Sequence, residues 1–191
     1  MRTKLHLISL LAFALATPAM GQDDASQGGA DALGGESALA VFVGADGNEL
    51  GSVTLTPNED GSVTLAGGLR DLSPGQHGFH FHQTGECDAS SGFESAGSHF
   101  NPTDMQHGLD NPEGPHLGDM PNVTAGEDGT VRVDLTTDRV TLTQGEEGSL
   151  FDEDGTAIVI HEGADDQMSD PSGNSGNRIA CAVVEPGAAV E

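Results

Sequence analysis

The chain has 191 residues, of which 31 are acidic and six are basic, so its formal net charge is −25 at neutral pH. This balance argues against nucleic acid and anionic membranes as partners, because both would be repelled. Only 4% of the residues are aromatic, but a hydrophobic fraction of 35% is enough for one buried core.

The N-terminal residues have the pattern of a secretory signal peptide. Arg2 and Lys4 precede an apolar run at 5–16, and small residues follow at Ala19 and Gly21. The run is too short to span a bilayer. We therefore expect residues 1–21 to be removed, with cleavage near 19–21, and the protein to be secreted to the periplasm or the extracellular space.

Composition divides the rest of the chain into three parts. Residues 22–37 are rich in Gly, Ala and Asp, with almost nothing large to bury, and this is typical of a disordered acidic leader. Residues 38–185 have the size of one domain, and residues 186–191 form a short tail.

Short segments rich in β-branched residues predict strands, and no helical period of useful length occurs. Asp-Gly and Glu-Asp-Gly turn signals lie between the segments, which cover residues 41–43, 52–56, 62–65, 131–135, 140–143, 157–160 and 179–183. This spacing predicts an all-β, antiparallel sandwich or barrel. Residues 84–121 differ, because they are dense in Gly, Asn, Asp, His and Pro. So long a stretch without strands in a compact domain is usually either functional or a sign of a wrong assignment, and here the histidines and a cysteine could hold a functional loop.

Cys87 and Cys181 are the two cysteines of the chain. In an oxidising compartment an even number favours a disulfide, here between the long loop and the last strand. In the chain-entropy model such a bond stabilises by about 4 to 5 kcal/mol. Two free thiols, or two thiolates that bind a metal, are the alternatives.

The seven histidines beyond residue 21 all lie between His77 and His161, and six of them fall within forty positions. Imidazole is the commonest protein ligand for zinc and copper. In a strand, His80 and His82 would share one face, and His161 could join them from a neighbouring strand.

A second group of metal-binding residues lies in the long loop. His107, His116 and Asp119 could enclose another ion and fold the loop as they bind it. The sequence therefore predicts two metal ions rather than one.

Five blocks of sequence resemble the secreted bacterial copper/zinc superoxide dismutases. In chain order they are HGFHFH at 77–82, SAGSHFNP at 95–102, HLGDMPNV at 116–123, VIHEGADD at 159–166 and GNSGNRIAC at 173–181. The resemblance implies a Greek-key antiparallel β-sandwich, or flattened barrel, with two long functional loops, a zinc/disulfide loop and an electrostatic loop.

The resemblance implies one copper and one zinc ion per chain, with His99 bridging them. The implied ligands are His80, His82, His99 and His161 for copper, and His99, His107, His116 and Asp119 for zinc. Asp165 would link a copper histidine to a zinc histidine, and His77 would buttress the copper loop. Cys87 and Cys181 match the family's disulfide.

The implied reaction is the disproportionation of superoxide to dioxygen and hydrogen peroxide. His99 would carry a proton, Arg178 would guide the anion, and Ser172 would flank the channel. A secreted copper-binding or copper-buffering protein and a copper-only enzyme are the rival interpretations. The family contains monomers and dimers, so a homodimer stays open.

The charge of the chain fits an anionic substrate poorly. Without Arg2 and Lys4, four arginines face 31 acidic residues and no lysine is left, which gives a formal charge of −27. Long-range repulsion should slow encounter, although screening leaves the local potential to decide the last approach. Adaptation to a salty medium is one hypothesis for this acidity, and a merely solubilising surface is the other.

Overall fold

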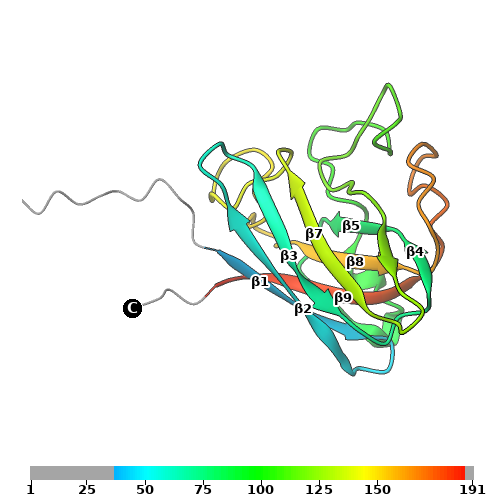
Figure 1. Ribbon diagram of the computed structural model, residues 1–191. Coiled ribbons are helices and arrows are strands. Elements are labelled where there is room, and N and C mark those ends of the chain that lie inside the picture. Colours follow the sequence, from blue (N-terminus) through cyan, green and yellow to red (C-terminus); the bar gives the residue numbers. More distant parts are fainter. Residues whose placement is uncertain (1–36, 188–191) are drawn as a thin grey trace, which may run out of the picture. The chain divides into compact units, whose positions relative to one another are not determined.

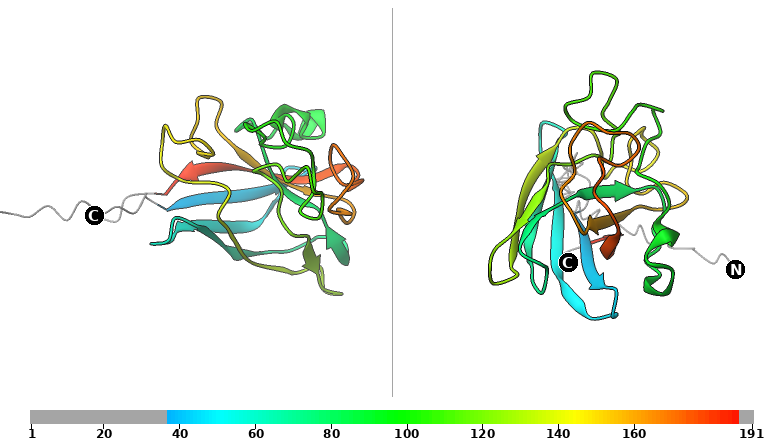
Figure 2. Two further views of the ribbon diagram at one scale, coloured as in Figure 1. Left: turned by 90° about the horizontal axis from the view of Figure 1, so that it is seen from above. Right: turned by 90° about the vertical axis from the view of Figure 1, so that its right-hand side faces the viewer.

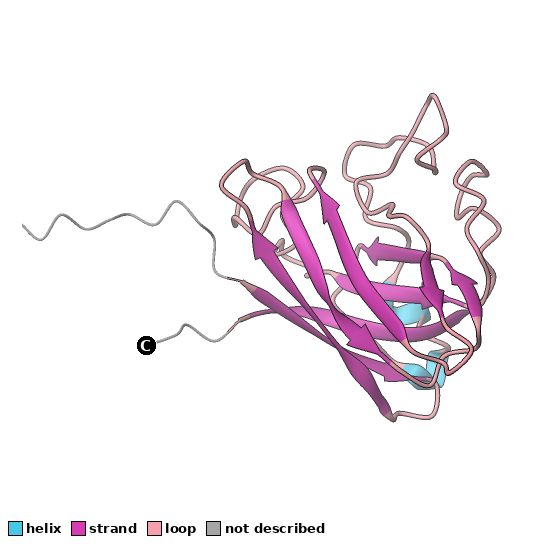
Figure 3. Ribbon diagram, in the orientation of Figure 1, coloured by secondary structure: helices cyan, strands magenta, loops and turns pink. Residues whose placement is uncertain are grey.

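The structure is a computed structural model that describes residues 37–187. The predicted signal peptide, nearly all of the predicted leader and residues 188–191 of the predicted tail lie outside the described residues. Strands dominate residues 37–187, and helical structure there is limited to two 3₁₀ turns, η1 (Ala89–Ser91) and η2 (Glu94–Ala96) (Figure 3). Neither turn has the length or the hydrophobicity of a membrane-spanning helix.

The described residues form one antiparallel sheet of nine strands, in the order β4-β6-β7-β3-β2-β1-β9-β8-β5. Figure 1 shows the sheet curving back on itself. The strands are β1 (Ala38–Gly44), β2 (Glu49–Pro57), β3 (Val63–Leu69), β4 (Gly75–His77), β5 (Phe79–His82), β6 (Val123–Ala125), β7 (Val131–Thr137), β8 (Ala157–His161) and β9 (Arg178–Pro186).

One chain segment closes this sheet. The two edge strands, β4 and β5, are consecutive in sequence and are separated only by Gly78. β4 pairs with β6 through His77 and Val123, while β5 pairs with β8 through His80 and Val159. Residues 75–82 therefore connect both ends of the sheet, and the predicted all-β flattened barrel is confirmed.

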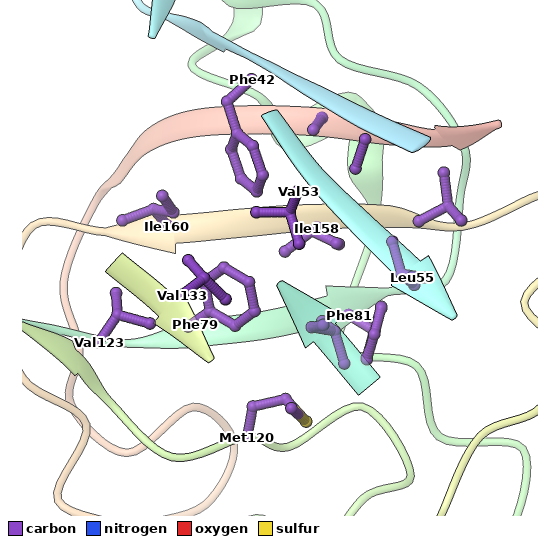
Figure 4. Close-up of a cluster of buried hydrophobic side chains, with 14 of the residues drawn as sticks. Phe42, Val53, Leu55, Phe79, Phe81, Met120, Val123, Val133, Ile158 and Ile160 are labelled. Carbon is purple, nitrogen blue, oxygen red and sulfur yellow. The ribbon is translucent and has the colours of Figure 1, made fainter. Parts of the chain in front are cut away.

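Alternation of side chains along the strands builds the core. In β1 every second residue is buried, and Phe42 of that strand stacks on Phe79 of β5 with ring centroids 6.2 Å apart. Figure 4 shows side chains from strands across the sheet pointing toward one another, including Val53 and Ile158, with Met120 joining them from the loop before β6. This core fixes the outward face of β5, on which the functional residues lie.

One predicted strand is wrong. Residues 140–143 form only an isolated bridge between Thr141 and Ser149. Val140 and Leu142 are buried, so the alternation in this segment reflects two side chains that a loop turns into the core. Two strands, β4 and β6, have three residues each and were too short to be predicted.

Candidate metal centre

Two neighbouring strands place three histidines together. His80 and His82 lie on β5, and the antiparallel pairing of β5 with β8 brings them beside the end of β8. His161 is the last residue of β8, at a shift in register that follows Ile160. All three rings are at most 3% exposed. The interpretation of His80 and His82 as sharing one face agrees with this arrangement.

The long loop returns along the free edge of β5. The Phe100 amide donates to the Phe81 carbonyl at 2.8 Å, and the Phe81 amide donates to the Gly118 carbonyl at 2.9 Å. A Cβ atom at Gly118 would lie 2.4 Å from the Phe81 carbonyl oxygen, so only glycine permits this approach. As a result His99 lies opposite His82, and Asp119, the residue after Gly118, lies opposite His80.

Four ring nitrogens converge without a hydrogen-bond partner. They are His80 Nδ1, His82 Nε2, His99 Nε2 and His161 Nε2, and all are buried. These four histidines form a group whose donor atoms lie within 4.8 Å of one another. Unpaired buried polar atoms are destabilising, so their convergence points to a bound ion. Four imidazoles are a donor set that suits copper.

The opposite nitrogen of each of these rings is hydrogen-bonded, and this orients the ring. His80 Nε2 donates to Asp165 Oδ2 at 2.7 Å. The Nδ1 atoms of His82 and His161 donate to the carbonyl oxygens of Gly97 and Gly176, at 2.9 and 3.1 Å. Because a carbonyl only accepts, these bonds fix the tautomer and leave a lone pair on Nε2.

A second donor set surrounds Asp119 Oδ1. This oxygen lies 3.0 Å from His99 Nδ1, 3.0 Å from His107 Nδ1 and 3.2 Å from His116 Nδ1. A tetrahedral zinc ion with bonds of about 2.0 to 2.1 Å separates its ligand atoms by about 3.3 Å. The four residues therefore fit zinc, and His99 belongs to both groups.

Asp165 connects the two donor sets. Its Oδ2 accepts from His80 and its Oδ1 accepts from His107 Nε2 at 3.0 Å. Gly173 has a positive φ of 61° and packs against this carboxylate, so closely that an added Cβ would lie 1.7 Å from Asp165 Oδ1. Asp165 thus occupies the linking position that the resemblance implies.

Burial keeps the copper-side rings neutral. It lowers the pKa of His80 to about 3 and that of His161 to about 4, and it holds the pKa of His82 well below its usual value. Neutral imidazoles are the form that binds metals.

The zinc side behaves differently. Burial acts to lower the pKa of His107, but hydrogen bonds to Asp119 and Asp165 outweigh it and raise that pKa to about 9. Burial likewise acts to raise the pKa of Asp119, and the hydrogen bonds from three histidines bring it far below its usual range. These hydrogen bonds favour the protonated ring of His107 in the absence of a metal, and a metal on Nδ1 would replace one proton.

A cavity of about 570 Å³ opens onto the copper-side rings. Its lining includes His82, His99, His161, Ser172 and Arg178, so the two predicted channel residues lie at the same opening. The Arg178 guanidinium donates from Nη1 to the Phe93 carbonyl at 2.6 Å and from Nη2 to the Gly97 carbonyl at 2.7 Å.

His77 does not contribute a donor to either group. Its buried ring lies between two backbone carbonyl oxygens. Nδ1 is 2.7 Å from the carbonyl oxygen of His161, and Nε2 is 2.8 Å from the carbonyl oxygen of Ser73. It therefore braces the end of β8, a position compatible with the predicted buttressing role.

The loop between β5 and β6 (residues 83–122) and the loop between β8 and β9 (residues 162–177) contact each other beside the metal-binding groups. Figures 1 and 2 show the green stretch of the first loop beside the orange second loop. The His107 amide donates to Asp170 Oδ1 at 2.8 Å, and the Asp110 amide donates to the Gln167 carbonyl at 3.0 Å. Sequence reasoning missed Asp170, because its partner is a backbone group 63 residues away.

Arg139 is a second residue that the sequence did not single out. Its Nη2 donates to the backbone carbonyl of Asp119 at 2.6 Å, so it ties the zinc-side loop to the segment after β7. The only signal for it was its rarity, as one of four arginines beyond Arg2.

The predicted disulfide is confirmed. Cys87 and Cys181 are bonded with their Cα atoms 5.6 Å apart, and the bond fastens the long loop to β9. Phe93 and Ala96 of this loop pack with Ala157, Val159 and Cys181 in a small buried cluster. The loop segment that carries the acceptors of Arg178 is thereby held against the barrel.

Comparisons with known proteins identify the family of this chain. Residues 49–184 match the model of the family described as copper/zinc superoxide dismutase. The chain is 47% identical over 148 residues to superoxide dismutase (Cu-Zn) 2 of Aquifex aeolicus, a match that covers 77% of this chain and 85% of the relative. It is 39% identical over 151 residues to superoxide dismutase (Cu-Zn) of Caulobacter vibrioides, covering 78% and 86% of the two chains.

A solved structure is also similar. The crystal structure of a SOD-like protein from Bacillus subtilis has a TM-score of 0.70 and 38% identity, and the match covers 78% of this chain and 98% of that chain. The family model, the relatives and the fold lead to one conclusion: this chain belongs to the copper/zinc superoxide dismutase family, in its bacterial type.

Proposed function

We propose that this protein disproportionates superoxide, converting two superoxide ions and two protons to dioxygen and hydrogen peroxide. One observation supports the proposal above all others. Four unpaired nitrogens converge, and three of their rings, those of His82, His99 and His161, line a cavity. The ring of His99 also turns its second nitrogen toward another donor set. In this arrangement a redox metal bound by the four nitrogens would lie next to a ring that could carry a proton.

His80, His82, His99 and His161 would hold copper, and His99, His107, His116 and Asp119 would hold zinc, one ion of each per chain. When bound, copper supplies the one-electron oxidation and reduction of superoxide, and zinc supplies a fixed charge without redox chemistry. Asp165 would fix the orientations of the His80 and His107 rings through its two oxygens.

Arg178 and Ser172 would receive the substrate. Two backbone carbonyls hold the guanidinium at the cavity wall, so an anion at that wall meets a fixed positive charge without reorganisation. Ser172 would contribute a small hydroxyl side chain to the same wall.

His99 would carry the proton. Its Nδ1 is oriented by the zinc-side donors, while its Nε2 points toward the copper side and lacks a protein partner. A ring fixed at one nitrogen can take up a proton at the other and deliver it to a product oxygen at the cavity base. His77 would keep the end of β8 in place.

The protein would act outside the cytoplasm. Residues 1–21 would serve as a signal peptide, residues 22–37 as a leader and residues 38–185 as the catalytic domain, with residues 186–191 as a tail. The Cys87–Cys181 disulfide supports this proposal, because such bonds persist in oxidising compartments.

The test combines metal analysis with a direct assay. The purified full chain should contain one copper and one zinc ion, consume superoxide in stopped-flow measurements, and lose activity when copper is removed by chelation. A metal-loaded protein that binds copper but does not accelerate superoxide decay would overturn the proposal in favour of copper buffering. Full activity without zinc would instead favour a copper-only enzyme.

A further inference from the structure

Two opposite charges lie together in the wall of the cavity. Among the described residues that line it, Arg178 is the one arginine and Glu94 is the one carboxylate. Glu94 Oε2 lies 3.7 Å from Arg178 Nη2. The Arg178 side chain is 15% exposed, whereas that of Glu94 is 75% exposed. A negative charge therefore stands in the solvent-filled approach to the fixed positive charge.

Arg178 does not need Glu94 in order to stay in place. Its guanidinium donates to the Phe93 and Gly97 carbonyls at 2.6 and 2.7 Å, and both lie in the loop that the disulfide and the Phe93 cluster secure. The contact with Glu94 is longer than a hydrogen bond. What Glu94 adds at the cavity is therefore chiefly its charge.

We propose that Glu94 sets the anion affinity of this cavity and makes it prefer singly charged anions. The proposal rests on the proposed function, in which Arg178 receives the substrate. The energy of an anion near a fixed charge is proportional to the charge of the anion. If Glu94 weakens the binding of a monoanion by a given factor, it weakens that of a dianion at the same place by about the square of that factor.

This selectivity suits a cavity that must admit a small monoanion in the presence of other anions. Superoxide carries one charge and would lose little affinity. Sulfate and hydrogen phosphate carry two charges and would be disfavoured at Arg178. Glu94 would thus be a specificity-determining residue that limits occupancy by dianions at a modest loss of superoxide encounter rate.

The test compares Glu94→Gln with the wild type in the copper- and zinc-loaded protein. Azide, a monoanion, is titrated and followed by visible absorption, and sulfate is then used as its competitor. We expect Glu94→Gln to bind azide about threefold more tightly at low ionic strength and sulfate about tenfold more tightly. Both gains should shrink as an inert salt is added. Melting temperature should stay unchanged, because Glu94 is exposed.

Glu127→Gln is the matched control, because it removes one exposed carboxylate that does not line the cavity. It should change neither affinity measurably. Weaker azide binding in Glu94→Gln would show that the carboxylate positions Arg178, and it would overturn the proposal. Equal gains for azide and sulfate would overturn it as well.

The azide and sulfate affinities separate this inference from the proposed function. If they change as expected in a loaded protein that does not consume superoxide, the proposed function fails and the role of Glu94 stands. If superoxide is consumed and the affinities do not change, only the role of Glu94 fails.

Discussion

His82 and Arg178 share one hydrogen-bond acceptor, the carbonyl oxygen of Gly97, which lies 2.9 Å from His82 Nδ1 and 2.7 Å from Arg178 Nη2. A single peptide unit therefore fixes the tautomer of a metal-side ring and the position of the guanidinium. Gly97 has a φ of 75°, and an added Cβ would lie 2.8 Å from Gln83 Cγ. Because of this shared acceptor, the position of Arg178 and the orientation of the His82 ring depend on the same loop.

Replacement of Arg178 by lysine tests this arrangement. Lysine keeps the charge but cannot donate to both the Phe93 and Gly97 carbonyls from a planar fork. We expect kcat/KM for superoxide to fall about tenfold, with copper affinity unchanged, as measured by stopped-flow decay and by chelator competition. Arg132→Lys, at an exposed position of β7, should leave both quantities unaltered. An Arg178→Lys protein as fast as the wild type would contradict the role of the fork.

Asp165→Asn should weaken zinc binding. The amide keeps the shape of the carboxylate, but it cannot accept from both His80 and His107 through charged oxygens. Loss of such an outer partner typically reduces metal affinity by about 10- to 100-fold. Competition with a colorimetric chelator measures this change, and Asp138→Asn, an exposed site, is the control. Zinc affinity equal in both variants would argue against the link.

Gly173→Ala should disturb the same carboxylate without changing any charge. The added Cβ would occupy the place of Asp165 Oδ1, in addition to the strain of a left-handed backbone. Gly47→Ala is a matched control, because Gly47 has a φ of 77° and open space around its Cβ. We expect Gly47→Ala to reduce the unfolding free energy by about 1 kcal/mol. Gly173→Ala should reduce it further and also speed zinc release, and similar values for both variants would contradict this.

Removal of the metals should lower the melting temperature and make stability depend strongly on pH. Metal at 1,000 times its dissociation constant stabilises by about 4 kcal/mol, which is about 8 to 16 °C for a domain of this size. The pKa of His80, about 3, and that of His161, about 4, lie below the unfolded value of 6.5. The unfolded chain thus binds more protons between these values, and stability falls as the pH drops below 6.5.

The titration of His107 changes stability with pH in the opposite direction. Its pKa of about 9 exceeds the unfolded value, so its contribution is fully present below pH 6.5 and is lost as the pH rises toward 9. The metal-free protein should therefore be most stable near pH 6.5, as chemical denaturation at a series of pH values would reveal. A monotonic rise from pH 4 to 9 would contradict these protonation states.

The acidic surface gives a prediction about salt. The 31 acidic residues repel one another, and few cations offset this repulsion, which therefore destabilises the folded state. Added salt screens the repulsion. If the composition is an adaptation to a salty medium, the melting temperature should rise by several degrees from low salt to about 2 M potassium chloride. A flat or falling curve would leave solubility as the explanation of this charge.

The grouping of the histidines could be predicted from the sequence because histidine is rare in this chain and most of its histidines lie close together in sequence. The alternation of His80 and His82 with Phe79 and Phe81 predicts a core face and a histidine face. In the structure the two phenylalanines lie in the core and the two histidines lie in a group that could hold a metal, although all four residues are buried. The segment at 140–143 shows the limit of this reasoning. Its alternation is real, but two side chains that a loop buries give the same pattern as a strand.

Contacts between side chains and distant backbone groups could not be predicted. Arg178 binds a carbonyl 85 residues away, and Arg139 binds one 20 residues away. Any residue offers such an acceptor, so composition holds no signal for it. The proximity of Glu94 to Arg178 could not be predicted either, because Glu94 is one of 31 acidic residues and the two positions are far apart in sequence.

The seam at Gly78 links two properties that are usually separate. Residues 75–82 zip the barrel shut, and two of them, His80 and His82, offer nitrogens to the copper side. These two histidines cannot move away from the rest of the copper side unless the strand pairing that closes the barrel is broken. The rigidity of these two copper-side rings is therefore a consequence of the closure of the barrel itself.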